Sequence, residues 1–86
     1  MITVYSKAQC PYCTQAKALL DDKNIPFTEV RIDENPAARQ FVVDRGHRTV
    51  PQIYWGDKLL VEGAFTGLKN LSDAELKQRM DNHANQ

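Results

Sequence analysis

The opening part of the chain follows the order strand, helix, strand, and this order restricts the fold more than any other feature. Residues 2–5 are short, apolar and β-prone, as in a strand buried on both faces. A helix is predicted at about 11–23, and a second strand at 27–32. Together these segments form a βαβ unit, so we expect two parallel strands with a right-handed crossover.

The predicted helix at 11–23 has signals at both ends. Pro11 suits the first helical position, because its φ is fixed and its missing N–H is not needed there. Asn24 is expected just after the helix, with Pro26 preventing its continuation. Apolar residues recur on one face of this helix: Cys13, Ala16, Leu19 and Leu20.

Signals for a second helix and a hairpin follow. Asn35 is predicted to cap a helix that begins at Pro36 and ends at Gly46. Two further strands are predicted at 50–55 and 58–61. Gly56-Asp57 between them favours a II′ turn, so the two strands are expected to form an antiparallel hairpin.

The last segment is less regular. A helical turn is expected near 66–70, followed by a kink. Ser72 and Glu75 form a capping box, which starts a final helix that runs to about Asn82. The end of the chain, residues 83–86, is expected to fray.

Composition narrows the class of protein. With 86 residues, 42% of them hydrophobic and 26% charged, the chain is expected to form one domain over residues 1–86. Eleven basic and eleven acidic side chains cancel, so no overall field favours nucleic acid or a membrane. No apolar run approaches the roughly 18 residues of a membrane span, and the pattern of a signal peptide is absent. Two cysteines are too few for a secreted disulfide scaffold, so we expect a cytoplasmic location.

Both cysteines stand where the first predicted strand leads into the first helix. Cys10 and Cys13 are neighbours in a helical first turn, close enough to form a disulfide. The N-cap position of Cys10 favours a thiolate, and Lys7 adds positive charge. Cys13 lies on the inward face. The pattern therefore predicts that Cys10 attacks a substrate disulfide and that Cys13 resolves the mixed disulfide.

Two other interpretations of the cysteines were weighed. The same spacing occurs in zinc sites, but four ligands are needed, and only His47 and His83 remain without a matching motif. Two inert, buried cysteines are the second interpretation, which the accessible N-cap position of Cys10 opposes. We therefore expect no metal.

Three segments, K-A-Q-C-P-Y-C, T-V-P-Q-I-Y and E-G-A-F-T-G, occur in the order and spacing of a known family. The chain resembles a dithiol glutaredoxin of the CPYC class from about Ile2 to Leu68. The resemblance implies a thioredoxin-like α/β fold, a four-stranded mixed sheet with flanking helices in βαβ-α-ββα order. It also implies that Pro51 is cis and faces the cysteines.

The resemblance implies a binding site for glutathione. The backbone of Val50 would pair with the cysteinyl part of the tripeptide. The implied binding residues are Lys7, Tyr12, Arg39, Thr49, Val50, Pro51, Phe65 and Thr66, with Arg39 a candidate for the glycyl carboxylate. For Lys7 and Arg39 the alternative is a solvated surface charge.

By this resemblance, the expected function is glutathione-dependent reduction of protein disulfides and glutathione mixed disulfides. The expected partners are glutathione and disulfide-containing or glutathionylated proteins, with ribonucleotide reductase as one example. A monomer without nucleic-acid or membrane partners is expected. Two alternatives stay open: a redoxin reduced by thioredoxin reductase, and a module that binds an iron–sulfur cluster with the help of glutathione.

Two departures from the family pattern weaken the glutathione site. Gly63-Ala64 stands where the family often has Gly-Gly, and Gly67 stands where it commonly has an acidic residue. That acid would meet the γ-glutamyl ammonium, and its loss costs about 1–2 kcal/mol if the contact is partly buried.

Two aromatic and three basic residues lie near the predicted hairpin. Tyr54 and Trp55 are expected to pack in the sheet. Arg45, His47 and Arg48 form a small basic patch, which either steers anionic glutathione or is simply solvated.

Overall fold

The computed structural model describes residues 1–84 and contains a four-stranded sheet with four helices. In chain order the elements are β1 (Ile2–Ser6), α1 (Pro11–Asp22), β2 (Phe27–Arg31), α2 (Pro36–Asp44), β3 (Gln52–Trp55), β4 (Lys58–Val61), α3 (Ala64–Asn70) and α4 (Asp73–Ala84). The strand order is β2-β1-β3-β4. β1 pairs in parallel with β2 and antiparallel with β3, which confirms the predicted mixed sheet.

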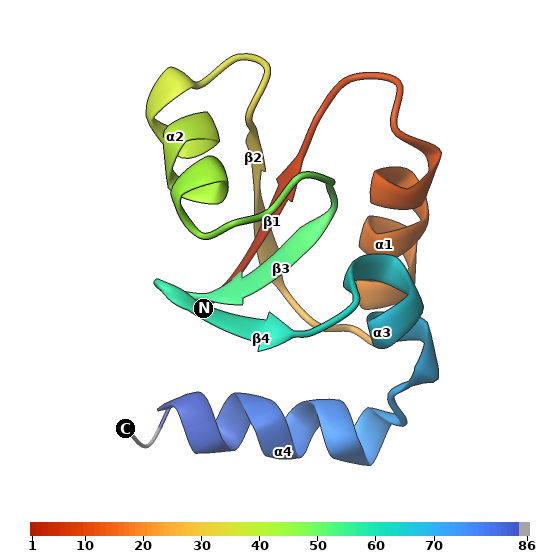
Figure 1. The fold of residues 1–86 in the computed structure, drawn as a ribbon. Helices are drawn as coiled ribbons and strands as arrows, with labels where there is room; N and C mark the ends of the chain where they lie inside the picture. Colours follow the sequence, from red (N-terminus) through yellow and green to blue (C-terminus); the bar gives the residue numbers. More distant parts are fainter. Residues whose placement is uncertain (85–86) are drawn as a thin grey trace.

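The first strand lies inside the sheet and organises its two faces. Ile2 and Val4 are fully buried on one face, where Val4 is paired with Ile53 of β3. Leu20 of α1 and Leu68 of α3 pack into the same core. Figure 1 shows α1 and α3 together on one side of the sheet, with α2 on the other.

The second face carries an aromatic cluster beneath α2. Tyr5 of β1 stacks on Phe41 of α2 at 5.3 Å between ring centroids, and both rings meet Tyr54 of β3 edge-on. Tyr54 is only 2% exposed, so its predicted packing role is confirmed. Trp55 packs partly buried against the main core, as predicted.

Side-chain caps begin the helices where the sequence predicted. Asn35 accepts a hydrogen bond from the Ala38 N–H at 3.0 Å, with Pro36 as the first helical residue. Ser72 and Glu75 exchange hydrogen bonds at 3.2 and 3.1 Å, which confirms the capping box. These signals are local in sequence, and this explains their reliability.

Several boundaries differ from the predictions. β3 begins at Gln52 instead of residue 50, because Pro51 has no N–H for the ladder. α3 begins at Ala64, two residues early, after Gly63 in a left-handed conformation with φ 82°.

The final helix is longer than predicted. It continues through His83 and Ala84, so the expected fraying is wrong for these two residues, and Asn85 and Gln86 lie outside the described residues. Met80 and His83 follow Leu76 on the inward face, and Met80 packs against the core. Within residues 1–84, every helix is too short or too polar to cross a bilayer.

Candidate functional site

The cysteine pair opens α1 at the loop end of β1. Cys10 is the N-cap, and its Sγ accepts a hydrogen bond from the Cys13 N–H at 3.2 Å. The two sulfurs are joined in a disulfide, with 5.2 Å between the Cα atoms. The N-cap position and the spacing predicted from sequence are therefore both confirmed.

The two sulfurs have different surroundings. Cys10 is half-buried, whereas Cys13 is 2% exposed and belongs to the buried face of α1. In the reduced protein, Cys10 meets the unpaired N–H groups at the helix N-terminus, which stabilise a thiolate. The side chain of Cys13 faces the core, so Cys10 is the more accessible of the two sulfurs.

A loop from the far half of the chain faces Cys10. The peptide bond between Val50 and Pro51 is cis, and the Val50 carbonyl oxygen lies 3.8 Å from Cys10 Sγ. Gln52, itself buried, donates from Nε2 to the Thr49 carbonyl at 2.8 Å. The backbone at Val50 is thereby held beside the redox-active sulfur.

Six of the eight residues expected to bind glutathione share one hollow of about 280 Å³, which we call the Phe65 hollow. Tyr12 and Phe65 stack at one side of it, with 5.8 Å between their ring centroids. Tyr12 is 60% exposed, so this ring pair faces solvent. The lining residues are Tyr12, Thr49, Val50, Pro51, Gly63, Ala64, Phe65 and Thr66.

Of the two departures from the family pattern, Gly63-Ala64 lines the Phe65 hollow and Gly67 follows its last lining residue, Thr66. Gly63 and Ala64 both have left-handed backbones, with φ of 82° and 54°. Gly67 approaches the chain so closely that a Cβ there would overlap the Glu62 carbonyl oxygen. An acidic side chain at position 67 therefore does not fit this backbone.

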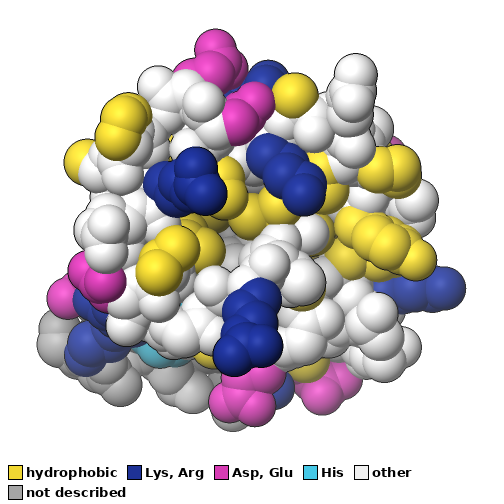
Figure 2. All heavy atoms as spheres, turned by 45° about the horizontal axis from the view of Figure 1, so that its top comes forward, with side chains coloured by type: hydrophobic (Ala, Val, Ile, Leu, Met, Phe, Trp, Pro, Cys, Tyr) yellow, Lys and Arg dark blue, Asp and Glu magenta, His cyan; other side chains and the backbone are white. Residues whose placement is uncertain are grey.

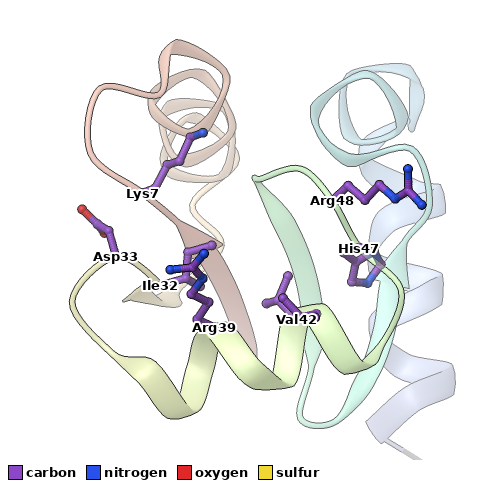
Figure 3. Close-up of a pocket in the computed structure, with 8 residues that line it drawn as sticks. Lys7, Ile32, Asp33, Arg39, Val42, His47 and Arg48 are labelled. Atoms are coloured by element: carbon purple, nitrogen blue, oxygen red, sulfur yellow. The ribbon is translucent and has the colours of Figure 1, made fainter.

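Lys7 and Arg39 lie in a neighbouring hollow of about 470 Å³, the Arg39 hollow. Figure 3 shows Lys7 coming from the loop after β1 and Arg39 from α2. Figure 2 shows basic side chains spaced around a depression on the loop-bearing face, with hydrophobic side chains between them. The lining residues are Lys7, Ile32, Asp33, Arg39, Val42, Val43, His47 and Arg48.

The one acidic residue of the Arg39 hollow is paired. Arg31 donates hydrogen bonds to both Asp33 carboxylate oxygens, at 2.9 and 2.7 Å, and this lowers the pKa of Asp33 to about 2. The Asp33 charge is thus offset by Arg31, which leaves the hollow with a positive character.

The predicted patch of Arg45, His47 and Arg48 does not form one surface. Arg45 lies 4.5 Å over the Phe41 ring and donates to the Asp57 carbonyl at 2.6 Å. His47 bonds to the buried Tyr54 hydroxyl, and only His47 and Arg48 line the Arg39 hollow. These three residues are close in sequence, but Arg45 contacts a different part of the fold from His47 and Arg48.

A polar network beside Cys13 was missed by sequence reasoning. The Cys13 hollow, about 440 Å³, is lined by Lys7, Ala8, Gln9, Cys10, Pro11, Cys13, Thr14, Lys17, Glu29 and Arg31. Lys17 and the fully buried Ser6 both donate to Glu29 Oε2, at 2.8 and 2.6 Å. These hydrogen bonds, from Lys17 first and Ser6 second, lower the pKa of Glu29. The only signal was a serine ending an apolar strand.

No group of three or more His, Cys, Asp or Glu side chains able to hold a metal ion occurs within residues 1–84. The cysteine pair at the N-terminus of α1, with the cis-proline loop opposite, supports thiol–disulfide chemistry. The protein combines a mixed sheet, a cysteine pair at the start of α1 and a cis-proline loop opposite that pair. These features define a dithiol protein of the thioredoxin-like class.

Comparison with known proteins names the family. The Glutaredoxin family model matches residues 2–60, so the chain belongs to the glutaredoxin family. Glutaredoxin 3 of Escherichia coli is 48% identical over 54 residues, which cover 62% of this chain and 65% of that protein. This chain therefore matches slightly less than two thirds of that relative.

Two further comparisons complete the picture. The glutaredoxin-like protein NrdH of Lactococcus lactis is 37% identical over 76 residues, covering 88% of this chain and 99% of that protein. A buckwheat glutaredoxin, solved as a glutathione complex, superposes with a TM-score of 0.73 at 23% identity, covering 94% of this chain and 76% of that one. The superposition confirms the thioredoxin-like fold.

Proposed function

We propose that the protein is a glutathione-dependent thiol–disulfide oxidoreductase of the dithiol CPYC class, reducing protein disulfides and glutathione mixed disulfides. The observation that supports this most is the position of Cys10. Its sulfur caps α1, is partly accessible, and lies 3.8 Å from the Val50 carbonyl at the edge of a hollow. A substrate sulfur can therefore approach Cys10 while its own backbone meets that of Val50.

The proposed chemistry divides two steps between the cysteines. The Cys10 thiolate attacks one sulfur of a substrate disulfide, forming a mixed disulfide and releasing the other sulfur as a thiolate that takes up a proton. Cys13 then loses its proton and attacks Cys10 Sγ, which forms the Cys10–Cys13 disulfide and releases the second substrate thiol. Two glutathione molecules reduce this disulfide and leave as one glutathione disulfide.

A mixed disulfide with glutathione needs only the first sulfur. Cys10 takes the glutathionyl group, and the deglutathionylated thiol leaves. A second glutathione thiolate then attacks the glutathionyl sulfur, which regenerates Cys10 and forms glutathione disulfide. Cys13 is not required for this cycle.

The proposed glutathione site spans two hollows. The Phe65 hollow takes the cysteinyl and γ-glutamyl parts, with Val50 offering backbone groups and Thr66 a hydroxyl. Lys7 and Arg39 in the adjoining hollow take the glycyl carboxylate, because cations form strong hydrogen bonds with it. The glutathione complex of the buckwheat relative supports this ligand class.

The same proposal extends to partners and location. The protein substrates are disulfide-containing or glutathionylated proteins, ribonucleotide reductase among them. We place the chain in the cytoplasm, where the glutathione pool keeps it supplied with electrons. The length of the chain supports a single domain over residues 1–86, and its balanced charge supports the lack of nucleic-acid and membrane partners; we propose that it acts as a monomer.

A redoxin that takes electrons from thioredoxin reductase is the competing function. It is favoured by Gly67, where the acidic contact for glutathione is missing. It is also favoured by the similarity to NrdH proteins, because the solved NrdH-redoxin of Escherichia coli is described as having a thioredoxin-like activity profile. The six residues gathered in the Phe65 hollow favour glutathione.

A reductant comparison separates the two functions. Purified protein is supplied with NADPH and a disulfide substrate, and with either glutathione plus glutathione reductase or thioredoxin reductase alone. We expect NADPH oxidation mainly in the glutathione mixture. Turnover only with thioredoxin reductase would overturn the proposal.

A further inference from the structure

The loop between α2 and β3 carries the backbone that faces Cys10. Two side-chain hydrogen bonds, which we call ties, hold this loop in place. Gln52 donates to the Thr49 carbonyl at 2.8 Å. The second tie is the 2.5 Å hydrogen bond between His47 Nε2 and the Tyr54 hydroxyl. Two residues separate His47 from Val50, so this bond lies one short segment away from the redox-active sulfur.

Tyr54 is a fixed anchor for this tie. Its side chain is 2% exposed and meets Tyr5 at 5.6 Å and Phe41 at 5.3 Å, so three elements of the fold hold the ring. Burial raises the pKa of Tyr54, although the charge of Arg45 opposes the shift, and the ring keeps its hydroxyl proton at neutral pH. The His47 ring packs edge-on against Tyr54, with 5.6 Å between centroids.

The middle of this loop is open to solvent. Thr49 and Arg48 are exposed, and Val50 is only half-buried. The His47 N–H donates to the Val42 carbonyl at 3.2 Å, which fixes the residue at the end of α2 but not the segment that follows. Figure 3 shows His47 and Arg48 on the loop at the end of the Arg39 hollow, across from Lys7.

We propose that His47 is a positioning residue: its hydrogen bond to Tyr54 sets the place of the Thr49-Val50-Pro51 backbone against Cys10. This inference rests on the proposed function, in which that backbone receives the substrate. His47 touches no reacting atom; it acts through Tyr54 and the loop. Its loss therefore weakens substrate binding more than the chemical step.

A double-mutant cycle tests the inference. The variants are His47→Ala, Tyr54→Phe and the two combined, with His47→Gln as the conservative variant because its amide reaches the position of Nε2. Steady-state kinetics with a glutathionylated peptide, glutathione and glutathione reductase give KM and kcat separately. We expect His47→Ala and Tyr54→Phe each to raise KM about fivefold, the effect of one lost hydrogen bond. The double variant should be no worse than either single variant, and His47→Gln should restore KM.

Two further measurements keep the outcome decisive. Urea unfolding is run on every variant, and a loss of stability with an unchanged KM would overturn the positioning role. Additive effects of the two substitutions on KM in the double variant would overturn it as well. Amide hydrogen exchange is measured at residues 48–50, where faster exchange in His47→Ala supports the role and unchanged exchange contradicts it. Because exchange needs no turnover, it decides the inference even if the wild-type protein does not use glutathione.

Discussion

Cys10 Sγ lies 3.8 Å from the carbonyl oxygen of Val50, although 40 residues separate them in the chain. The contact joins the beginning of α1 to the loop that precedes β3. Under the proposed function, a substrate bound through its backbone at Val50 would therefore be aligned with Cys10. The division of roles between the two cysteines is the first property to test.

Cys10→Ser should lose all disulfide reduction, by about a thousandfold or more, because it removes the nucleophile. Cys13→Ser should keep most of its activity on a glutathionylated peptide but lose reduction of a protein disulfide. Both reactions are followed by coupled NADPH oxidation. Equal losses in the two assays for Cys13→Ser would contradict the assigned roles.

The basic residues of the Arg39 hollow give a second prediction. Lys7→Ala and Arg39→Ala should each raise the KM for a glutathionylated peptide about fivefold to tenfold, since each removes a proposed charge-assisted hydrogen bond to the glycyl carboxylate. The difference from wild type should shrink in high salt. Lys77→Ala, an exposed change on α4, is the matched control. An unchanged KM would mean that the mutated cation is only solvated.

Gly67 is expected to tolerate no side chain. Gly67→Ala should lower the free energy of unfolding by about 3 kcal/mol, because its Cβ overlaps the Glu62 carbonyl and the backbone has to move. Gly46→Ala is the control: its φ is +83°, but open space surrounds it, so the cost should be about 1 kcal/mol. Urea unfolding measures both, and equal losses would contradict the steric explanation.

Ala64 is expected to be an unfavourable residue at its own position. Its φ of 54° is left-handed, and glycine adopts this conformation without the Cβ penalty. Ala64→Gly should therefore stabilise the protein by about 0.5–1 kcal/mol, or raise Tm by about 3–6 °C. The exposed helical Ala18→Gly should instead destabilise it by about 1 kcal/mol. A fall in Tm for Ala64→Gly would contradict the prediction.

Glu29 should make stability depend on pH. Its pKa is lowered in the folded protein by hydrogen bonds from Lys17 and Ser6, so the folded state favours the carboxylate. This stabilisation is fully present above the ordinary pKa of 4.5 and is lost as pH falls through the lower folded value.

The variant Glu29→Gln measures this contribution. It should be less stable than wild type by about 0.5–1 kcal/mol at pH 7, the size expected for a partly exposed pair. The difference should disappear in the acid range. Urea unfolding at several pH values, with the exposed Glu62→Gln as control, gives the comparison. A difference that does not change with pH would contradict the ionic explanation.

Local signals in the sequence predicted most of the fold. The helix caps at Asn35 and Ser72 and the contact between the two cysteines each involve residues three positions apart. They could therefore be predicted directly from the sequence. The cis bond before Pro51 and its place opposite Cys10 came from the family resemblance, because no short-range pattern contains them. The last two residues of α4, His83 and Ala84, were missed because packing of the inward face on the core, where Met80 lies, supports them more than propensity does.

The parts of the site that were not predicted depend on contacts between distant strands and loops. Ser6 contacts Glu29 because β1 and β2 pair in a particular register. The spacing of residues in the sequence does not predict that register. Tyr54 was expected to pack in the sheet, but its bond to His47 needs the path of the whole loop. The patch of three basic residues was read as one surface because the sequence does not show that the loop turns between them.

The close approach of Gly67 to Glu62 also limits how this protein can change over evolutionary time. A relative with an acid at this position cannot arise by one substitution, since the new side chain would first meet the Glu62 carbonyl. The backbone from Glu62 through the turn at Gly63 and Ala64 would have to move first. A side chain at position 67 and the path of the turn before it are therefore coupled, and we expect them to change together.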